Sequence, residues 1–236
     1  MVFRATLVSL AVASALFPMG SMAAPIALPD TPPAMNQVQQ SNAWLEISLG
    51  QFKQNMAQFR SHLSSQTKLC VVMKADAYGN GIRGLMPTIL ELNVPCIAIA
   101  SNAEARTVRD SGFEGQLVRV RSADIQEIEQ AMDLDIEELI GSLEQANQIK
   151  SLSTDKTIKV HLALNDGGMS RNGIDMSTEK GKQEALDIAK HQGIDIVGIM
   201  THFPNYDADE VRSKLADFNQ SSAWLIENAN LNRNDV

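Results

Sequence analysis

The chain has 236 residues, of which 44% are hydrophobic, so it is long enough to bury one sizeable core. Its formal net charge is −8, from 28 acidic and 20 basic residues, and no basic run or basic-aromatic stripe interrupts the mixture. This charge would repel a phosphate backbone on average, so we expect no nucleic-acid partner.

The N-terminal part contains two segments that precede the folded domain. Residues 1–23 combine one cation, Arg4, with an apolar stretch and small residues at the end, which is typical of a secretory signal peptide. The stretch is too short for an ordinary transmembrane helix. Residues 24–42 carry four prolines and are expected to form an extended arm. We expect cleavage after Ala23, export to the periplasm and a mature form without a membrane span.

Residues 43–236 alternate short apolar runs with helical patterns, which predicts one α/β domain with a parallel sheet. A first strand is predicted over Trp44–Ile47. The six strand-like runs that follow are Leu69–Met73, Cys96–Ala100, Leu117–Val120, Glu138–Ile140, Ile158–Leu164 and Ile194–Met200. The N-caps expected for three of the intervening helices are Ser101, which has capping-box spacing to Glu104, Ser122 and Ser142. A doubly wound sheet and a (β/α)8 barrel share this pattern.

The run Leu69–Met73 ends on Lys74 and breaks at once into a turn that carries glycines. In parallel α/β folds, chemistry is placed at the carboxyl ends of the strands. An amine held there among apolar side chains loses hydration, which favours a neutral nucleophile and base. A lysine taken alone at such a position is more often a surface residue that closes a strand.

The stretch Lys74–Gly81, with the sequence KADAYGNG, resembles the cofactor-binding signature of the alanine racemases, which are fold-type III pyridoxal 5'-phosphate (PLP) enzymes. The resemblance implies that Lys74 holds PLP as a Schiff base and is a catalytic base, and that Tyr78 contacts the phosphate. The resemblance also implies a fold for residues 43–236. They would form an incomplete parallel (β/α)8 barrel of the TIM type, with six of the eight strands, as in the alanine racemase N-terminal domain.

Residues 161–173, with the sequence HLALNDGGMSRNG, resemble the strand and loop whose arginine binds the substrate carboxylate in that family. The resemblance implies substrate-binding roles for Arg171, whose planar fork matches a carboxylate, and for Asn172. Alanine racemases usually have a lysine, often carbamylated, where Ala163 stands. We therefore expect an anion or a water to position Arg171 instead.

Two histidines lie in or after predicted strands. Ile199–Pro204 resembles the family's strand that ends in Thr-His-Phe, which implies that His202 lies against the PLP ring. His161 lies inside a strand and is interpreted as a core residue.

Arg119 and Arg121 are predicted to lie on one side of a strand, near its carboxyl end. Two cations that face a barrel interior need an anion or acidic partners between them. The alternative, in which both face the helices and pair with Glu or Asp, has equal weight. Together with the altered Arg171 loop, the two arginines resemble the exported broad-specificity racemases of the family, so we expect them to bind substrate.

The two cysteines, Cys70 and Cys96, each lie near the start of an apolar run. Their spacing fits no zinc pattern, and we expect no metal site. Export permits a disulfide, and the two residues can form one if their strands are neighbours.

The resemblance implies PLP-dependent racemisation of amino acids with broad specificity, including alanine and basic amino acids, by a two-base mechanism in a full-length homodimer. The second base and the last two barrel strands are expected outside this chain. We therefore expect the 236 residues alone to be inactive, and to be poorly soluble because unpaired strand edges aggregate. The alternatives are a non-catalytic PLP-binding barrel protein, which the signal peptide disfavours, and a relic fragment.

Overall fold

The computed structural model describes residues 44–152, 157–169, 173–204, 207–234 and 236. The strands in these ranges are β1 (Cys70–Val72), β2 (Cys96–Ile99), β3 (Gln116–Arg119), β4 (Glu138–Ile140), β5 (Ile158–Ala163) and β6 (Ile194–Met200). The α-helices are α1 (Leu49–His62), α2 (Lys74–Tyr78), α3 (Ile82–Glu91), α4 (Asn102–Asp110), α5 (Ile125–Glu129), α6 (Leu143–Lys150), α7 (Glu179–Ala189) and α8 (Ala208–Asn228). Two 3-10 turns are η1 (Met132–Leu134) and η2 (Asn165–Gly167). The predicted signal peptide and proline-rich arm lie outside the described residues.

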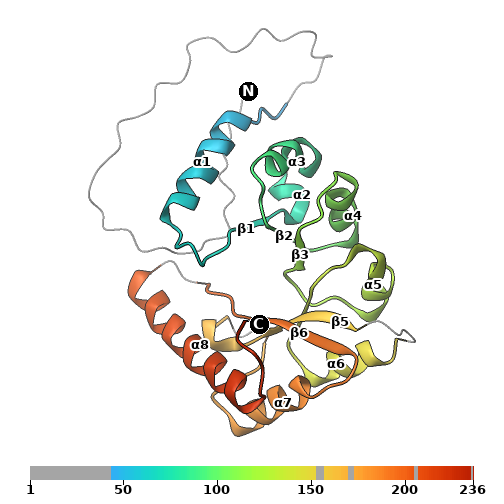
Figure 1. Cartoon of the computed structure of the whole chain (residues 1–236), viewed down its shortest axis with the longest axis vertical. Coiled ribbons are helices and arrows are strands. Elements are labelled where there is room, and N and C mark those ends of the chain that lie inside the picture. The colour runs from blue at the N-terminus through green and yellow to red at the C-terminus, as the bar shows by residue number, and fades with distance from the viewer. Residues whose placement is uncertain (1–43, 153–156, 170–172, 205–206, 235) are drawn as a thin grey trace.

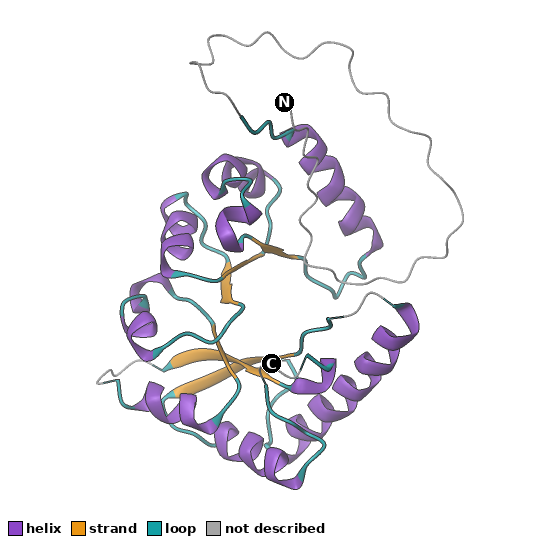
Figure 2. Ribbon diagram, turned by 180° about the vertical axis from the view of Figure 1, so that it is seen from behind, coloured by secondary structure: helices purple, strands orange, loops and turns teal. Residues whose placement is uncertain are grey.

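The described strands are all parallel and pair in chain order. One sheet has the order β1-β2-β3 and the other β4-β5-β6. A parallel bridge between Val118 and Glu137 connects them, and the Glu137 N–H donates to the Leu117 carbonyl at 2.8 Å. Helices lie on the outer side of the strands (Figure 1; Figure 2). This arrangement confirms the predicted α/β fold, a parallel barrel with six of its eight strands.

Two local predictions were wrong. Trp44–Ile47 is not a strand, because no other strand in the described ranges pairs with it, and Trp44 and Leu45 are 43% and 50% exposed. Helix α5 is capped by Asp124, whose side chain accepts a hydrogen bond from the Glu127 N–H, and not by Ser122. The helices of the described ranges include no segment with the length and apolar character that a membrane span requires.

Two apolar clusters fill the space between the strands and the outer helices. The first contains Ile97, Ile99 and Leu117 of β2 and β3, and the second contains Val160 and Leu162 of β5. Because side chains alternate along a strand, the neighbouring residues of each strand point to the inner face of the barrel. The inner face of the barrel is therefore formed by the residues of each strand that alternate with those in the two apolar clusters.

Cys70 and Cys96 form the predicted disulfide, which is confirmed. They are register partners at the start of β1 and β2, with their Cα atoms 4.4 Å apart. Cys96 precedes the core residue Ile97, so the bridge lies on the inner face. The disulfide ties the first two strands together at the end opposite Lys74.

We predict that replacing both cysteines by serine lowers the free energy of unfolding by roughly 3 kcal/mol, because the bridge closes a loop between residues separated by 26 positions. Urea denaturation of the oxidised protein and of the double variant measures this. Dithiothreitol should shift the wild-type midpoint and leave the variant unchanged. Equal midpoints for the two oxidised proteins would contradict a stabilising bridge.

Candidate active site

Lys74 follows β1 and opens the segment with the predicted signature. Val71 and Met73 pack into the first apolar cluster, and the Met73 N–H donates to the Ala98 carbonyl at 2.7 Å. The pairing of β1 with β2 thus continues up to the residue before Lys74. Lys74 itself lies just beyond the carboxyl end of the strand, as the first residue of α2, and it is partly buried.

The segment after Lys74 is a left-handed helical turn. The φ angles of Ala75, Asp76, Ala77 and Tyr78 are 54°, 52°, 54° and 54°. This conformation costs an L residue about 1–2 kcal/mol relative to the right-handed helix. Four such residues in succession persist only where surrounding contacts hold them, and strain of this kind is concentrated at functional sites.

Backbone hydrogen bonds and one side chain close this turn. The Ala77 N–H donates to the Met73 carbonyl at 2.7 Å, and the Gly81 N–H donates to the Asp76 carbonyl at 2.9 Å. The Asp76 side chain accepts a further bond from the Ile82 N–H at 2.8 Å, at the start of α3. Met73 and Ala77 are almost fully buried. The turn is therefore anchored at both ends.

The turn brings together two of the predicted cofactor-binding residues. The Lys74 Nζ lies 5.7 Å from the centre of the Tyr78 ring. The Tyr78 side chain is partly open to solvent, with 43% of the residue exposed. An amine and a phenol thus share one accessible position at the sheet edge.

His202 follows β6 at the same edge of the barrel. The Thr201 hydroxyl accepts a hydrogen bond from the Gly167 N–H at 2.8 Å. A side chain at Gly167 would overlap the carbonyl group of His202, so only glycine allows this approach. The turn η2, which follows β5, is therefore packed directly against the backbone that carries His202.

A second contact joins η2 to α8. The Ser221 hydroxyl donates to Asp166 Oδ1 at 2.6 Å, while Asp166 Oδ2 is buried and has no hydrogen-bond partner in the described part of the chain. Burial raises the pKa of the Asp166 carboxyl, and the bond from Ser221 opposes this shift. Helix α8 and β6 together fix the start of the loop after β5.

Ala163 lies at the carboxyl end of β5, in register with Met200, and is buried. It alternates with the core residue Leu162 and so belongs to the inner face. Arg171 and Asn172, in the loop that follows, lie outside the described residues. Their substrate roles stay predictions.

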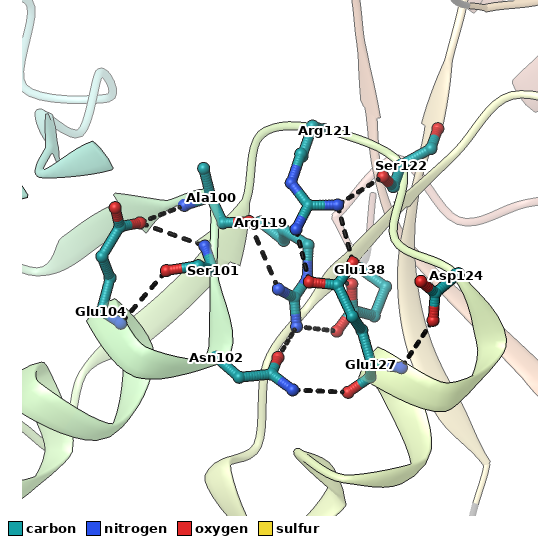
Figure 3. A network of polar contacts seen from close by, with 10 residues as sticks. All are labelled: Ala100, Ser101, Asn102, Glu104, Arg119, Arg121, Ser122, Asp124, Glu127 and Glu138. Atoms are coloured by element: carbon teal, nitrogen blue, oxygen red, sulfur yellow. Dashed lines mark hydrogen bonds and ion pairs between the residues drawn. The ribbon is translucent and has the colours of Figure 1, made fainter. Parts of the chain in front are cut away.

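Arg119 is fully buried and faces the helices, since Leu117 of the same strand packs into the first cluster. Its Nε and Nη2 atoms donate to the two carboxylate oxygens of Glu138 at 2.7 and 3.1 Å. Nη2 also donates to Asn102 Oδ1 at 2.7 Å, as Figure 3 shows. Burial raises the pKa of Glu138, while the bonds from Arg119 oppose the shift.

Arg121 pairs with a helix residue at the surface. Its Nη1 donates to Glu127 Oε2 at 2.8 Å and to the Ser122 carbonyl at 3.0 Å (Figure 3). The bond from Arg121 lowers the pKa of Glu127, against the effect of burial. Both arginines thus pair with a glutamate, which agrees with the alternative in which they pair with Glu or Asp. Their contact with substrate stays a prediction.

Comparison with known proteins gives the family. The model of the alanine racemase N-terminal domain matches residues 47–234. The chain belongs to the alanine racemase family. It is 66% identical over 237 residues to a broad specificity amino-acid racemase of Vibrio parahaemolyticus, covering 99% of this chain and 58% of the relative. It is 42% identical to a lysine racemase of Proteus mirabilis, over 83% of this chain and 49% of the relative.

Solved structures agree with this assignment. The alanine racemase of Clostridium difficile 630 in complex with cycloserine superposes with a TM-score of 0.67 at 25% identity, over 75% of this chain and 50% of that chain. The alanine racemase of Corynebacterium glutamicum, at 23% identity, gives a TM-score of 0.63 over 78% of this chain and 51% of that chain. The chain therefore spans from about half to 58% of the length of these racemases.

Within this barrel, sequence reasoning missed the partners of Arg119. The sequence pattern places Glu138 in a strand without a role and predicts no role for Asn102. The sequence contains a signal for this pair, namely the acidic Glu138 in an otherwise apolar strand. A buried carboxylate needs a cation beside it or must lose its charge. Alternation along the two strands would have suggested Arg119 as that cation.

We predict that Arg119→Ala and Glu138→Ala each destabilise the protein by about 3–5 kcal/mol, because each leaves one buried charge without its partner. The double variant Arg119→Met/Glu138→Leu should lose less than the sum. The exposed pair Arg106–Asp133, 3.4 Å apart, provides the control, and Asp133→Ala should cost about 1 kcal/mol or less. Urea denaturation measures all four, and additive losses at Arg119 and Glu138 would contradict the coupling.

Proposed function

We propose that this chain is the N-terminal barrel part of a PLP-dependent amino-acid racemase of broad specificity. The observation that carries the proposal is the position of Lys74, at the carboxyl end of β1 and beside Tyr78, in a strained turn whose sequence matches the family signature. The relatives with the names broad specificity amino-acid racemase and lysine racemase support the choice of substrate class.

The residues of the site fit PLP by their chemistry. Lys74 supplies an amine that can bond to the cofactor aldehyde, and it is partly accessible at the sheet edge. The exposed Tyr78 offers a phenol that can donate a hydrogen bond to a phosphate. His202, after β6, would lie against the ring. The glycines Gly79 and Gly81, both with positive φ, keep the backbone around Tyr78 free of side chains.

When bound, PLP supplies an electron-poor ring that stabilises the negative charge left after the α proton departs. Lys74 Nζ would accept and return that proton on one face of the substrate. Inversion needs an acid on the opposite face, which we place outside this chain, in a partner subunit of a homodimer.

We propose that the substrate carboxylate is bound by Arg171 with Asn172 beside it. Ala163 removes the bulk and charge of the family's lysine from the inner face of β5, which would leave room for longer side chains. We propose that Arg121, in the loop after β3, contacts the substrate directly. Arg119 would act from its buried ion pair by fixing that loop.

We also propose that the protein acts in the periplasm. Residues 1–23 would direct export and be removed after Ala23, and residues 24–42 would form an arm. The disulfide between Cys70 and Cys96 fits an oxidising compartment, since such bridges are rare in the cytosol.

We predict that PLP labels Lys74 when the protein is incubated with it and reduced with borohydride. Peptide mapping should place the pyridoxyl group on Lys74, and Lys74→Arg should abolish the label. Lys68→Ala, six residues upstream, is the control and should be labelled like the wild type. A label confined to other lysines would overturn the cofactor assignment.

We predict that Arg171→Ala, in a form of the protein as long as its relatives, raises KM for L-alanine, L-lysine and L-arginine by at least about tenfold. The variant would leave the substrate carboxylate without its bidentate partner, a loss of about 1.5–3 kcal/mol for a charged hydrogen bond. PLP labelling of Lys74 should survive. Loss of optical activity measures the rate, and an unchanged KM would transfer the role to Arg121.

A further inference from the structure

Glu104, in the first turn of α4, contacts the segment that follows Lys74. Its Oε1 accepts a hydrogen bond from the Ala75 N–H at 2.7 Å. Its Oε2 accepts from the Ala100 N–H at 2.8 Å and the Ser101 N–H at 3.0 Å, the two bonds drawn in Figure 3. One carboxylate therefore connects the left-handed turn after β1 with the start of the helix after β2.

Helix capping explains only part of this arrangement. In a capping box the side chain of the third helical residue bonds back to the N-cap backbone, as Glu104 Oε2 does with Ser101. Helix α6 has a comparable contact with a neutral residue, since Gln145 Oε1 accepts from the Gly141 N–H at 2.8 Å. A single amide oxygen is therefore enough at a helix start. The bond to Ala75 requires a second acceptor, which a carboxylate provides and an amide does not.

The Ala75 N–H belongs to the same rigid unit as the Cα atom of Lys74. A peptide group is planar and includes both flanking Cα atoms, so an acceptor that fixes the N–H also fixes the plane from which the Lys74 side chain extends. The first N–H groups of a helical turn have no acceptor within the turn. Glu104 supplies that acceptor at the first residue of the strained turn.

We propose that Glu104 is a positioning residue for Lys74. It holds the peptide plane between Lys74 and Ala75 and thereby keeps the amine at the strand end in the orientation that the cofactor requires. The inference rests on the proposed function of Lys74. The contact of Glu104 with Ala75 does not depend on that function, so the two can be tested separately.

The variant Glu104→Gln separates positioning from capping. Its one amide oxygen can still serve the Ala100 and Ser101 N–H groups, but its NH₂ group would then face the Ala75 N–H, and two donors repel. We compare it in the purified protein with Glu104→Ala and with Gln145→Ala, which removes the matched contact on α6. Thermal unfolding reports capping, and amide hydrogen exchange followed by NMR reports the turn.

In Glu104→Gln the Ala75 amide should exchange at least about tenfold faster than in the wild type, because a hydrogen bond to a charged acceptor is lost. Its unfolding midpoint should fall less than that of Glu104→Ala, because the bonds to the Ala100 and Ser101 N–H groups are kept. Glu104→Ala should show both the faster exchange and a lower midpoint. Gln145→Ala should lower the midpoint and leave exchange at Ala75 unchanged. Wild-type protection of Ala75 in Glu104→Gln would overturn the proposal.

Incubation with PLP and borohydride tests the consequence for Lys74. The label at Lys74 should form more slowly in Glu104→Gln than in Gln145→Ala, although the amine itself is unchanged. Equal labelling in both variants would show that the contact holds the turn without positioning the lysine, and would overturn the proposal. If the wild type takes no label at Lys74, the proposed function fails, and the exchange of Ala75 still decides whether Glu104 holds the turn.

Discussion

The left-handed turn after Lys74 is the constraint on which the candidate site depends. Four non-glycine residues with positive φ are costly, and the cost is met by the burial of Met73 and Ala77 and by hydrogen bonds at both ends of the turn. A turn that is stable only in this environment cannot relax without losing those contacts. The amine at its start is thus attached to a segment held in one conformation, which the proposed cofactor-binding role of Lys74 requires.

Between β3 and β4, side-chain contacts supplement the backbone pairing that joins the other neighbouring strands of the barrel. The β3–β4 junction has an isolated bridge, and beside it the buried Arg119–Glu138 pair joins the same two strands. Asn102 extends the network, since it accepts from Arg119 and donates to the Glu127 carbonyl at 2.9 Å (Figure 3). A buried ion pair often stabilises a fold no more than apolar residues would, but it defines which groups must meet. Here the network joins the segments that follow β2 and β3 to the first residue of β4.

The sequence allowed the position of Lys74 and the Cys70–Cys96 bridge to be predicted, because a contiguous signature and the pairing of consecutive strands are local information. It did not allow the handedness of the turn to be predicted. Alanine, aspartate and tyrosine do not favour positive φ, so the conformation comes from tertiary contacts. Alternation placed Arg119 and Arg121 on one side of a strand, but the side depends on whether an acid is available behind the sheet, and Glu138 provides it.

The start of the loop after β5 is held in place although an alanine stands at position 163. Where alanine racemases usually carry a lysine, Ala163 contributes no charge and no hydrogen bond from its side chain. The start of the loop is nevertheless fixed by contacts with two other elements, Gly167 with Thr201 and Asp166 with Ser221. Those contacts do not involve the side chain of residue 163, whose backbone carbonyl accepts a hydrogen bond from the Ile174 N–H at 2.9 Å after the loop. The side chain at position 163 can therefore change without loss of the contacts that hold the start of the loop.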